Sequence, residues 1–356
     1  MDRPDRATAG PGGEDMQGGD TGGEGRGGIR ARVRAALLPL LAAIVTLVCQ
    51  EWVGRATVYA PELEPGRLKI HRAIVENRPP PGETWHSMGA NGINVRVASV
   101  FLVEGLHRAT GRPVLKLYKH LDTVCLFTAL ILLALFLRRW FDPLWCLVGT
   151  LYFAAVLPLT YFFALFHPWD RLDLVAWLVL LFALRARRPW LFAALLVVST
   201  PIKYSTVALP GLWWLVHVRR EDWLRTSLAT AAFLALAFGT STALRMARPG
   251  GFDAYEGGLA AYVVDMLASN AGKVATFNIA LPPLLALALP LLTGAFGLSG
   301  ADRFVRMAAL FALLLFVPFA LLVHIEEFRM QVQNLVLLLP LSLLGLRSLL
   351  VDGRGN

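Results

Sequence analysis

The sequence predicts an all-α fold, a polytopic transmembrane helical bundle of about ten spans. Of the 356 residues, 56% are apolar, whereas soluble domains average about 45–50%. The mean hydropathy is +0.56. Arginines stand mostly at the ends of long uncharged runs, where basic residues act as topology signals. These observations indicate an integral membrane protein.

The net charge and the cysteines exclude two other classes. The formal charge of +9 does not indicate a nucleic-acid partner, because the basic residues flank apolar runs, where they suit lipid phosphates. Cys49, Cys125 and Cys146 each lie in an apolar run without the spacing of a zinc site or a redox pair. We expect these cysteines to pack against other helices.

The N-terminal part divides into a tail, an anchor and a loop. Residues 1–30 are rich in glycine and charge, which predicts a disordered cytoplasmic tail before the bundle of residues 31–350. The first span, residues 35–53, follows three arginines that hold its start in the cytoplasm. No small-residue cleavage site is evident, so this span stays as an anchor. Residues 54–118 form a large first external loop.

Basic flanks set the direction of the later spans. We expect these spans at 121–137, 143–163, 174–184, 224–244, 280–298, 307–323 and 335–350. Residues 245–279 form a second large external loop, and residues 351–356 form a cytoplasmic tail. The protein is therefore expected to be a multi-pass protein of the inner (plasma) membrane, with both termini in the cytoplasm.

The segment between the fourth span and residue 224 has two interpretations. Basic residues stand at both of its ends, and a polar break, residues 200–206, lies in its middle. Each half has about a dozen residues, short for a full span, so we expect a hairpin of two short helices with Lys203 near the outer side. One long broken helix is the alternative. It would place Arg303, Arg306 and Arg347 outside, against the charge bias.

The first external loop carries one helix signal, at about residues 93–107. The run is rich in apolar residues, with Arg96, Glu104 and His107 interspersed, and such a pattern suits a helix lying in the membrane interface. It predicts a platform for a lipid substrate at the outer leaflet. An ordinary loop helix packed on the bundle is the alternative.

This topology places most unusual polar side chains on the external face. Charges close to the hydrocarbon are expensive unless they pair or line an aqueous cavity, which makes them functional candidates. The candidate substrate-binding residues are Arg96, His167, Arg171, Asp173, Lys203, His324, Glu326, Glu327 and Arg329. The alternatives are interfacial anchoring or helix capping for HPWDRLD (residues 167–173), snorkelling for Lys203 and a simple loop end for residues 326–329.

The layout and two stretches carry a family resemblance. STPIKYSTVALPGLWWL, residues 199–215, resembles the TKYS or TKYT segment of dolichyl-phosphate-mannose-type transferases. FHPWDRLDLVAWLVLLFALRARR, residues 166–188, resembles a segment of bacterial polytopic proteins with the same architecture. With the large first loop, the chain is similar to the GT-C superfamily of polyprenyl-phosphate-sugar-dependent glycosyltransferases.

The resemblance implies a chemistry and a set of residues for it. A carboxylate would take the proton of the acceptor hydroxyl while the acceptor displaces the lipid phosphate at the sugar C1. Members carry an acidic residue or pair in the first external loop, which here corresponds to Glu62 and Glu64, with Glu51 nearer the first span. Asp170 is the competing base on its position alone. Lys203, Arg329 and Arg96 would stabilise the departing phosphate.

The expected partners follow from the same resemblance. They are membrane lipids, a lipid-linked sugar donor and envelope-glycan assembly proteins. The sequence contains no evident metal-ligand cluster, although a divalent cation is a cofactor that the resemblance allows. Phosphate-loop, dinucleotide, zincin and serine-hydrolase motifs are absent from the sequence. A transporter or lipid flippase and a noncatalytic subunit of polysaccharide assembly remain the alternatives.

Overall fold

The computed structural model describes Leu37 and residues 40–57, 59–85, 96–161, 169–248, 258–276, 281–322 and 328–351. Regular structure in these residues is entirely helical, so the predicted all-α class is confirmed. The α-helices are α2 (Glu64–Glu76), α3 (Ala98–Thr110), α4 (Val114–Leu137), α5 (Pro143–Val156), α6 (Asp170–Arg185), α7 (Pro189–Ser199), α8 (Leu209–His217), α9 (Trp223–Met246), α10 (Gly258–Thr276), α11 (Leu281–Gly297), α12 (Arg303–Leu322) and α13 (Val332–Leu350). Shorter helical segments are η1 (Val48–Gly54), η2 (Pro61–Leu63), η3 (Leu157–Tyr161), η4 (Tyr204–Ala208) and η5 (Phe328–Met330).

Four helices of the described chain are long and apolar enough to cross a bilayer. They are α4, α5 with its continuation η3, α9 and α13. Each has at least 19 residues, and about 20 residues at 1.5 Å each span the hydrocarbon core. Leu40–Gly54, Pro189–Ser199 and Leu285–Gly297 are apolar but shorter. The architecture is that of a membrane protein.

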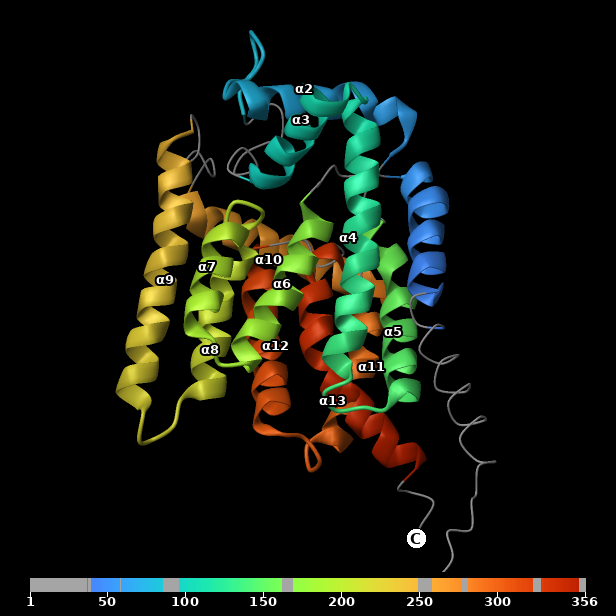
Figure 1. Cartoon of the computed structure of the whole chain (residues 1–356), viewed down its shortest axis with the longest axis vertical. Coiled ribbons are helices and arrows are strands. Elements are labelled where there is room, and N and C mark those ends of the chain that lie inside the picture. The colour runs from blue at the N-terminus through green and yellow to red at the C-terminus, as the bar shows by residue number, and fades with distance from the viewer. Residues whose placement is uncertain are drawn as a thin grey trace, which may run out of the picture.

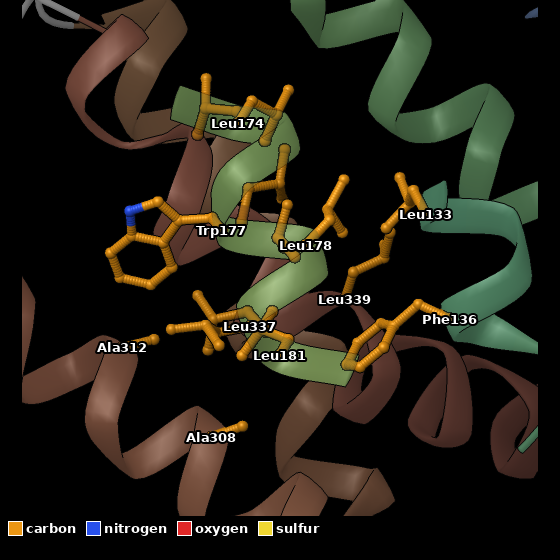
Figure 2. Packing of buried hydrophobic residues seen from close by; sticks show 14 of the residues in the cluster. Leu133, Phe136, Leu174, Trp177, Leu178, Leu181, Ala308, Ala312, Leu337 and Leu339 are labelled. Carbon is orange, nitrogen blue, oxygen red and sulfur yellow. The ribbon is translucent and has the colours of Figure 1, made fainter. Parts of the chain in front are cut away.

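Helix α6 lies in the interior of the bundle, as its composition requires. Leu174, Trp177, Leu178 and Leu181 form one face of the helix and are each at most 1% exposed, and Leu180 and Ala183, on its other sides, are at most 2% exposed. Figure 2 shows the four residues of that face among side chains of α4, α12 and α13, namely Leu133, Phe136, Ala308, Ala312, Leu337 and Leu339. A helix that is apolar all round is stable only when other elements surround it.

Helices α11 and α13 approach each other closely because glycine stands at their contact. A Cβ atom added to Gly345 would lie 1.7 Å from the carbonyl oxygen of Thr293, so a larger residue cannot fit there. The hydroxyl groups of Thr293 and Ser342 are 2.7 Å apart and share a hydrogen bond. Small residues and hydroxyl pairs of this kind are typical of packed membrane helices.

Helices α2 and α3, here named the helical cap, lie across one end of the bundle (Figure 1). The Arg248 guanidinium, just after α9, donates to the Ile74 carbonyl of α2 at 2.7 Å. The Ala98 N–H at the start of α3 donates to the Pro201 carbonyl at 3.1 Å. The helix expected at residues 93–107 is observed as Ala98–Thr110, and α2 was not expected.

The opposite end is named the arginine-rich end, after the arginines in or next to its helix connections: Arg138, Arg139, Arg185, Arg187, Arg188, Arg219, Arg220, Arg303 and Arg306. Asp302, before α12, accepts hydrogen bonds from Trp140 at 2.9 Å and from Arg185 at 3.4 Å. The Arg303 guanidinium donates to the Val218 carbonyl. The connections α4–α5, α6–α7, α8–α9 and α11–α12 therefore meet at one end of the bundle, and all four were predicted to share one side.

Helices α7 and α8 form the expected hairpin. The ring of Phe192, near the start of α7, lies 5.0 Å from the ring of Trp213, near the end of α8. His217, the last residue of α8, has its Nε2 atom 2.9 Å from the Leu184 carbonyl of α6. The two helices are thus antiparallel, and the polar break between them lies toward the helical cap.

Candidate functional site

Asp170, the first residue of α6, is held by two cations. The Lys203 Nζ atom lies 2.9 Å from its Oδ1 atom, and the Arg329 Nη1 atom lies 3.3 Å from its Oδ2 atom. The three side chains are 11%, 2% and 9% exposed. Each carboxylate oxygen therefore faces one cation, which favours the ionised form of Asp170.

Asp173, one turn further along α6, is completely buried and has three polar neighbours. The Ser205 hydroxyl lies 2.9 Å from its Oδ1 atom, and Gln333 Nε2 donates to its Oδ2 atom at 2.7 Å. Lys203 Nζ is 3.9 Å away. The Gln333 Oε1 atom is buried and has no hydrogen-bond partner within the described segments, which is uncommon for a buried amide.

The polar break between α7 and α8 explains how a lysine comes to point inward. Lys203 has an extended backbone, with φ of −161° and ψ of 132°, between the end of α7 and η4. The Ser199 and Thr206 hydroxyls, 3.2 Å apart, join the two sides of the break. Lys203 is 1% exposed, so it does not snorkel to water. The four residues Asp170, Asp173, Lys203 and Arg329 are named the Asp170 cluster.

Arg96 joins this region from the helical cap. Its Nη2 atom donates to the Tyr204 hydroxyl at 3.1 Å. Its Cζ atom lies 4.9 Å from the Tyr204 ring centroid and 5.2 Å from that of Trp169. The Cζ atom of Arg245, in α9, lies 5.9 Å from the centroid of the same Tyr204 ring. Two guanidinium groups, of Arg96 and Arg245, therefore lie close to the ring of Tyr204, the residue after Lys203.

Arg171 makes separate contacts, with η3. Its Nη2 atom donates to the Thr160 hydroxyl at 2.5 Å, and its Cζ atom lies 4.4 Å from the Tyr161 ring centroid. It interacts electrostatically with Asp122 of α4, whose Oδ2 atom accepts a hydrogen bond from the Tyr59 hydroxyl at 2.5 Å. This second buried group lies beside the Asp170 cluster.

Asp122, Tyr59 and Gln333 were not among the site residues predicted from the sequence. Asp122 had a readable signal, because it is a lone carboxylate near the start of a run predicted as apolar, residues 121–137. Tyr59 and Gln333 had none, since each partner lies 63 or 160 residues away along the chain.

Glu62 and Glu64 lie apart from the Asp170 cluster. Both are exposed, Glu62 in η2 and Glu64 at the start of α2. Glu62 interacts electrostatically with Arg67. Glu64 lines a cavity of about 480 Å³ between α2, α3 and the start of α4. The structure therefore brings neither glutamate next to Lys203 or to Arg329 in the described segments.

His71 forms the inner part of that cavity in the helical cap. Its Nδ1 atom is 2.8 Å from the Tyr118 hydroxyl, and its Nε2 atom is 3.2 Å from Glu104 Oε2. Burial lowers the pKa of His71 below its ordinary value, against the effect of Glu104. The hydrogen bond from Arg108 lowers the pKa of Glu104. At neutral pH, the imidazole of His71 is therefore neutral and the neighbouring carboxylate of Glu104 is ionised.

Four candidate residues have no described structure, and the described residues contain no cluster of metal ligands. His167, His324, Glu326 and Glu327 lie outside the described residues. Among the described residues, no three His, Cys, Asp or Glu side chains gather closely enough to hold a metal ion. Carboxylate oxygens of the Asp170 cluster instead face ammonium, guanidinium, hydroxyl and amide groups.

Comparison with known proteins found no matching protein-family model, curated protein or solved structure. The site is therefore interpreted from its own geometry. It combines cations that suit an anionic ligand, one carboxylate beside them and a buried amide oxygen without a partner in the described segments.

Proposed function

We propose that this protein is a membrane glycosyltransferase that moves a sugar from a polyprenyl-phosphate donor to an envelope glycan, lipid or protein acceptor. The observation that carries the proposal is the convergence of Lys203 and Arg329 on the carboxylate of Asp170. The cations come from two segments, the α7–α8 break and η5, and they meet at the end of the bundle that the helical cap covers.

An anionic donor offers a reason for this arrangement. Lysine and arginine both bind phosphate, arginine through its planar fork and lysine as a point charge. A phosphate entering between Lys203 and Arg329 would replace the Asp170 carboxylate as their partner. Asp170 would then be released beside the bound donor, with its oxygens free to accept a proton.

The transfer step forms one bond at the sugar C1 and breaks another. The acceptor hydroxyl oxygen forms a bond to the sugar C1, and the bond from C1 to the phosphate oxygen breaks. The electron pair of that bond leaves with the lipid phosphate, whose charge Lys203 and Arg329 stabilise. The hydroxyl proton passes to Asp170 acting as general base. Once the donor phosphate has replaced Asp170, both cations already face the oxygen on which negative charge develops.

Other candidate residues take positioning roles in this proposal. Asp173 would accept hydrogen bonds from sugar hydroxyls, and Gln333 would accept or donate them. Both side chains are buried near Lys203. Arg96 would bind phosphate from the cap side, and Arg171 would keep the start of α6 in place. Glu62 and Glu64, the acidic residues implied by the family resemblance, are the competing bases.

The proposal includes the topology and the setting. About ten spans in a GT-C-like layout, in the inner (plasma) membrane, would put both termini and the arginine-rich end in the cytoplasm. The helical cap and the Asp170 cluster would face outward. Membrane lipids, the lipid-linked donor and envelope-glycan assembly proteins are the proposed partners, and a divalent cation remains a proposed cofactor.

The proposal is tested by replacing the carboxylates and profiling glycans. We expect Asp170→Asn to lower the glycan product, normalised to the protein level, by at least about 100-fold, the usual contribution of a general base. Asp302→Asn, which alters a carboxylate at the arginine-rich end, should leave the product unchanged. Mass spectrometry of envelope and lipid-linked glycans, alongside quantitative immunoblotting, measures both.

The outcomes separate the candidate bases and the rival classes. Loss of product only in Glu62→Gln or Glu64→Gln would transfer the base to the first loop. Normal product from all three variants would refute this assignment of the base and favour a noncatalytic subunit of polysaccharide assembly.

A transporter is the second candidate, and one observation favours it. Asp122 and Arg171 are buried inside the bundle near the Asp170 cluster, and buried ionisable groups of this kind mark ion or substrate pathways. Movement of a fluorescent polyprenyl-phosphate lipid between leaflets of proteoliposomes tests it. Flipping by wild type that Asp122→Asn abolishes would replace the glycosyltransferase proposal.

A further inference from the structure

A narrow apolar groove runs between α11, α12 and α13 at the arginine-rich end. Its volume is about 290 Å³. Leu338 and Leu341 of α13 form its floor, and Gly294 and Ala295 of α11 leave space that larger side chains would fill. From Pro290 to Leu298, the groove follows the last eight residues of α11 and the residue after them, about 12 Å along the helix axis.

One charged side chain, Arg306, lines this otherwise apolar groove. It lies one turn into α12, near the α11–α12 connection. In the described segments, its guanidinium has no hydrogen-bond or ion-pair partner, whereas Arg303 binds the Val218 carbonyl and Arg185 pairs with Asp302. The groove thus has an apolar length and a cationic end.

We propose that this groove binds one acyl chain of an anionic phospholipid, whose phosphate pairs with Arg306. In a membrane protein a groove between apolar helices faces lipid rather than water, and an acyl chain fills it. Basic pockets between transmembrane helices bind anionic head groups, and the arginine fork matches phosphate oxygens. The site goes beyond the proposed glycosyltransferase activity and does not depend on it.

The charge pattern favours an anionic lipid over a zwitterionic one. Asp302, the nearest acidic residue along α12, already accepts hydrogen bonds from Trp140, Arg185 and the Val305 N–H. It is therefore occupied, and the charge of Arg306 is left for a lipid phosphate. A choline group brings a second positive charge to the same place, which weakens the attraction.

Native mass spectrometry of the purified full chain tests the proposal, with phosphatidylglycerol and phosphatidylcholine of identical acyl chains as probes. We expect preferential retention of one phosphatidylglycerol by wild type. Arg306→Gln should weaken that binding about fivefold, the effect of roughly 1 kcal/mol for a basic residue near the membrane surface. Ala295→Leu, at an exposed position of the groove wall, should weaken both lipids by filling the groove.

Arg347→Gln is the matched control, because it removes an exposed arginine near the same end of α13 but outside the groove. It should leave lipid retention unchanged. Equal binding of the two lipids by wild type would overturn the proposal, as would unchanged binding by Arg306→Gln. An equal loss in Arg347→Gln would also overturn it, because the effect would then be one of general surface charge.

Discussion

The two ends of the bundle both carry ion pairs, but they use them differently. At the cap end, Lys203 and Asp170 are 2% and 11% exposed, and Asp173 is not exposed at all. At the arginine-rich end, Arg185 and Asp302 are 28% and 44% exposed. A buried ion needs its partner to offset lost hydration, while an exposed ion has water as a substitute. Removing one partner of an ion pair should therefore lower the free energy of unfolding more at the cap end than at the arginine-rich end.

The largest expected difference comes from removing one cation at each end. Lys203→Met leaves two buried carboxylates without a close ammonium, and breaking such a pair costs about 3–5 kcal/mol. Arg185→Met removes an exposed partner and should cost at most about 1 kcal/mol. Thermal unfolding in one detergent measures both.

Lys203→Arg is the control for the charge itself, and it should recover part of the lost stability. Equal melting temperatures for Lys203→Met and Arg185→Met would show that burial does not distinguish the two ends.

A second pair of variants compares the carboxylates. Asp173→Asn disturbs hydrogen bonds from Ser205 and Gln333 and weakens the pairing to Lys203, and an unsatisfied buried group costs about 1–3 kcal/mol. Asp302→Asn keeps its hydrogen bond to the Val305 N–H at the start of α12, because asparagine caps helices as well as aspartate does. We expect Asp173→Asn to be the more destabilised by chemical denaturation. The reverse order would contradict the comparison.

The smallest expected effect is a difference in pH response. Burial lowers the pKa of His71 in the folded protein, so its contribution is fully present above the unfolded pKa of about 6.5 and is lost as pH falls through the folded value. Burial opposes ionisation of Asp302, but hydrogen bonds from Val305 and Trp140 outweigh it and lower its pKa. Its contribution is lost only below about pH 4.

Hydrogen exchange followed by mass spectrometry separates the two ends. Between pH 7.5 and 5.5, corrected for intrinsic exchange rates, peptides of the helical cap should lose protection while peptides around Asp302 keep theirs. His71→Gln should remove the response of the cap. An unchanged response in that variant would assign the titration to another group.

The sequence predicted the helical class and much of the arrangement because hydropathy and arginine position act over short distances. The basic flanks of residues 189–217 predicted the α7–α8 hairpin, and the charged segments around Asp170, Lys203 and Arg329 were expected on one face. The structure places these three side chains together. Their chemical roles remain predictions.

The rest of the site depends on contacts between distant segments. The pairing of Asp173 with Gln333 follows from how α6 and α13 pack, and that of Asp122 with Tyr59 from how the segment before η2 lies on α4; no local pattern encodes either. Glu62 and Glu64 were chosen because of their position in a family layout, and exposed positions in the cap do not by themselves direct a side chain toward the bundle. Burial, rather than residue type, distinguishes the carboxylates of Asp170 and Asp173 from those of Glu62 and Glu64.

The close approach at Gly345 has a consequence for how a ligand could enter. Because the backbones of α11 and α13 are in contact at Gly345, we expect the two helices to move together rather than slide along each other. Arg329 lies in η5, three residues before the first residue of α13. Lys203 lies on the non-helical backbone of the α7–α8 break, which we expect to move more readily than the α11–α13 pair. Opening of the ion pairs would thus proceed by a swing of Lys203 away from a stationary Arg329.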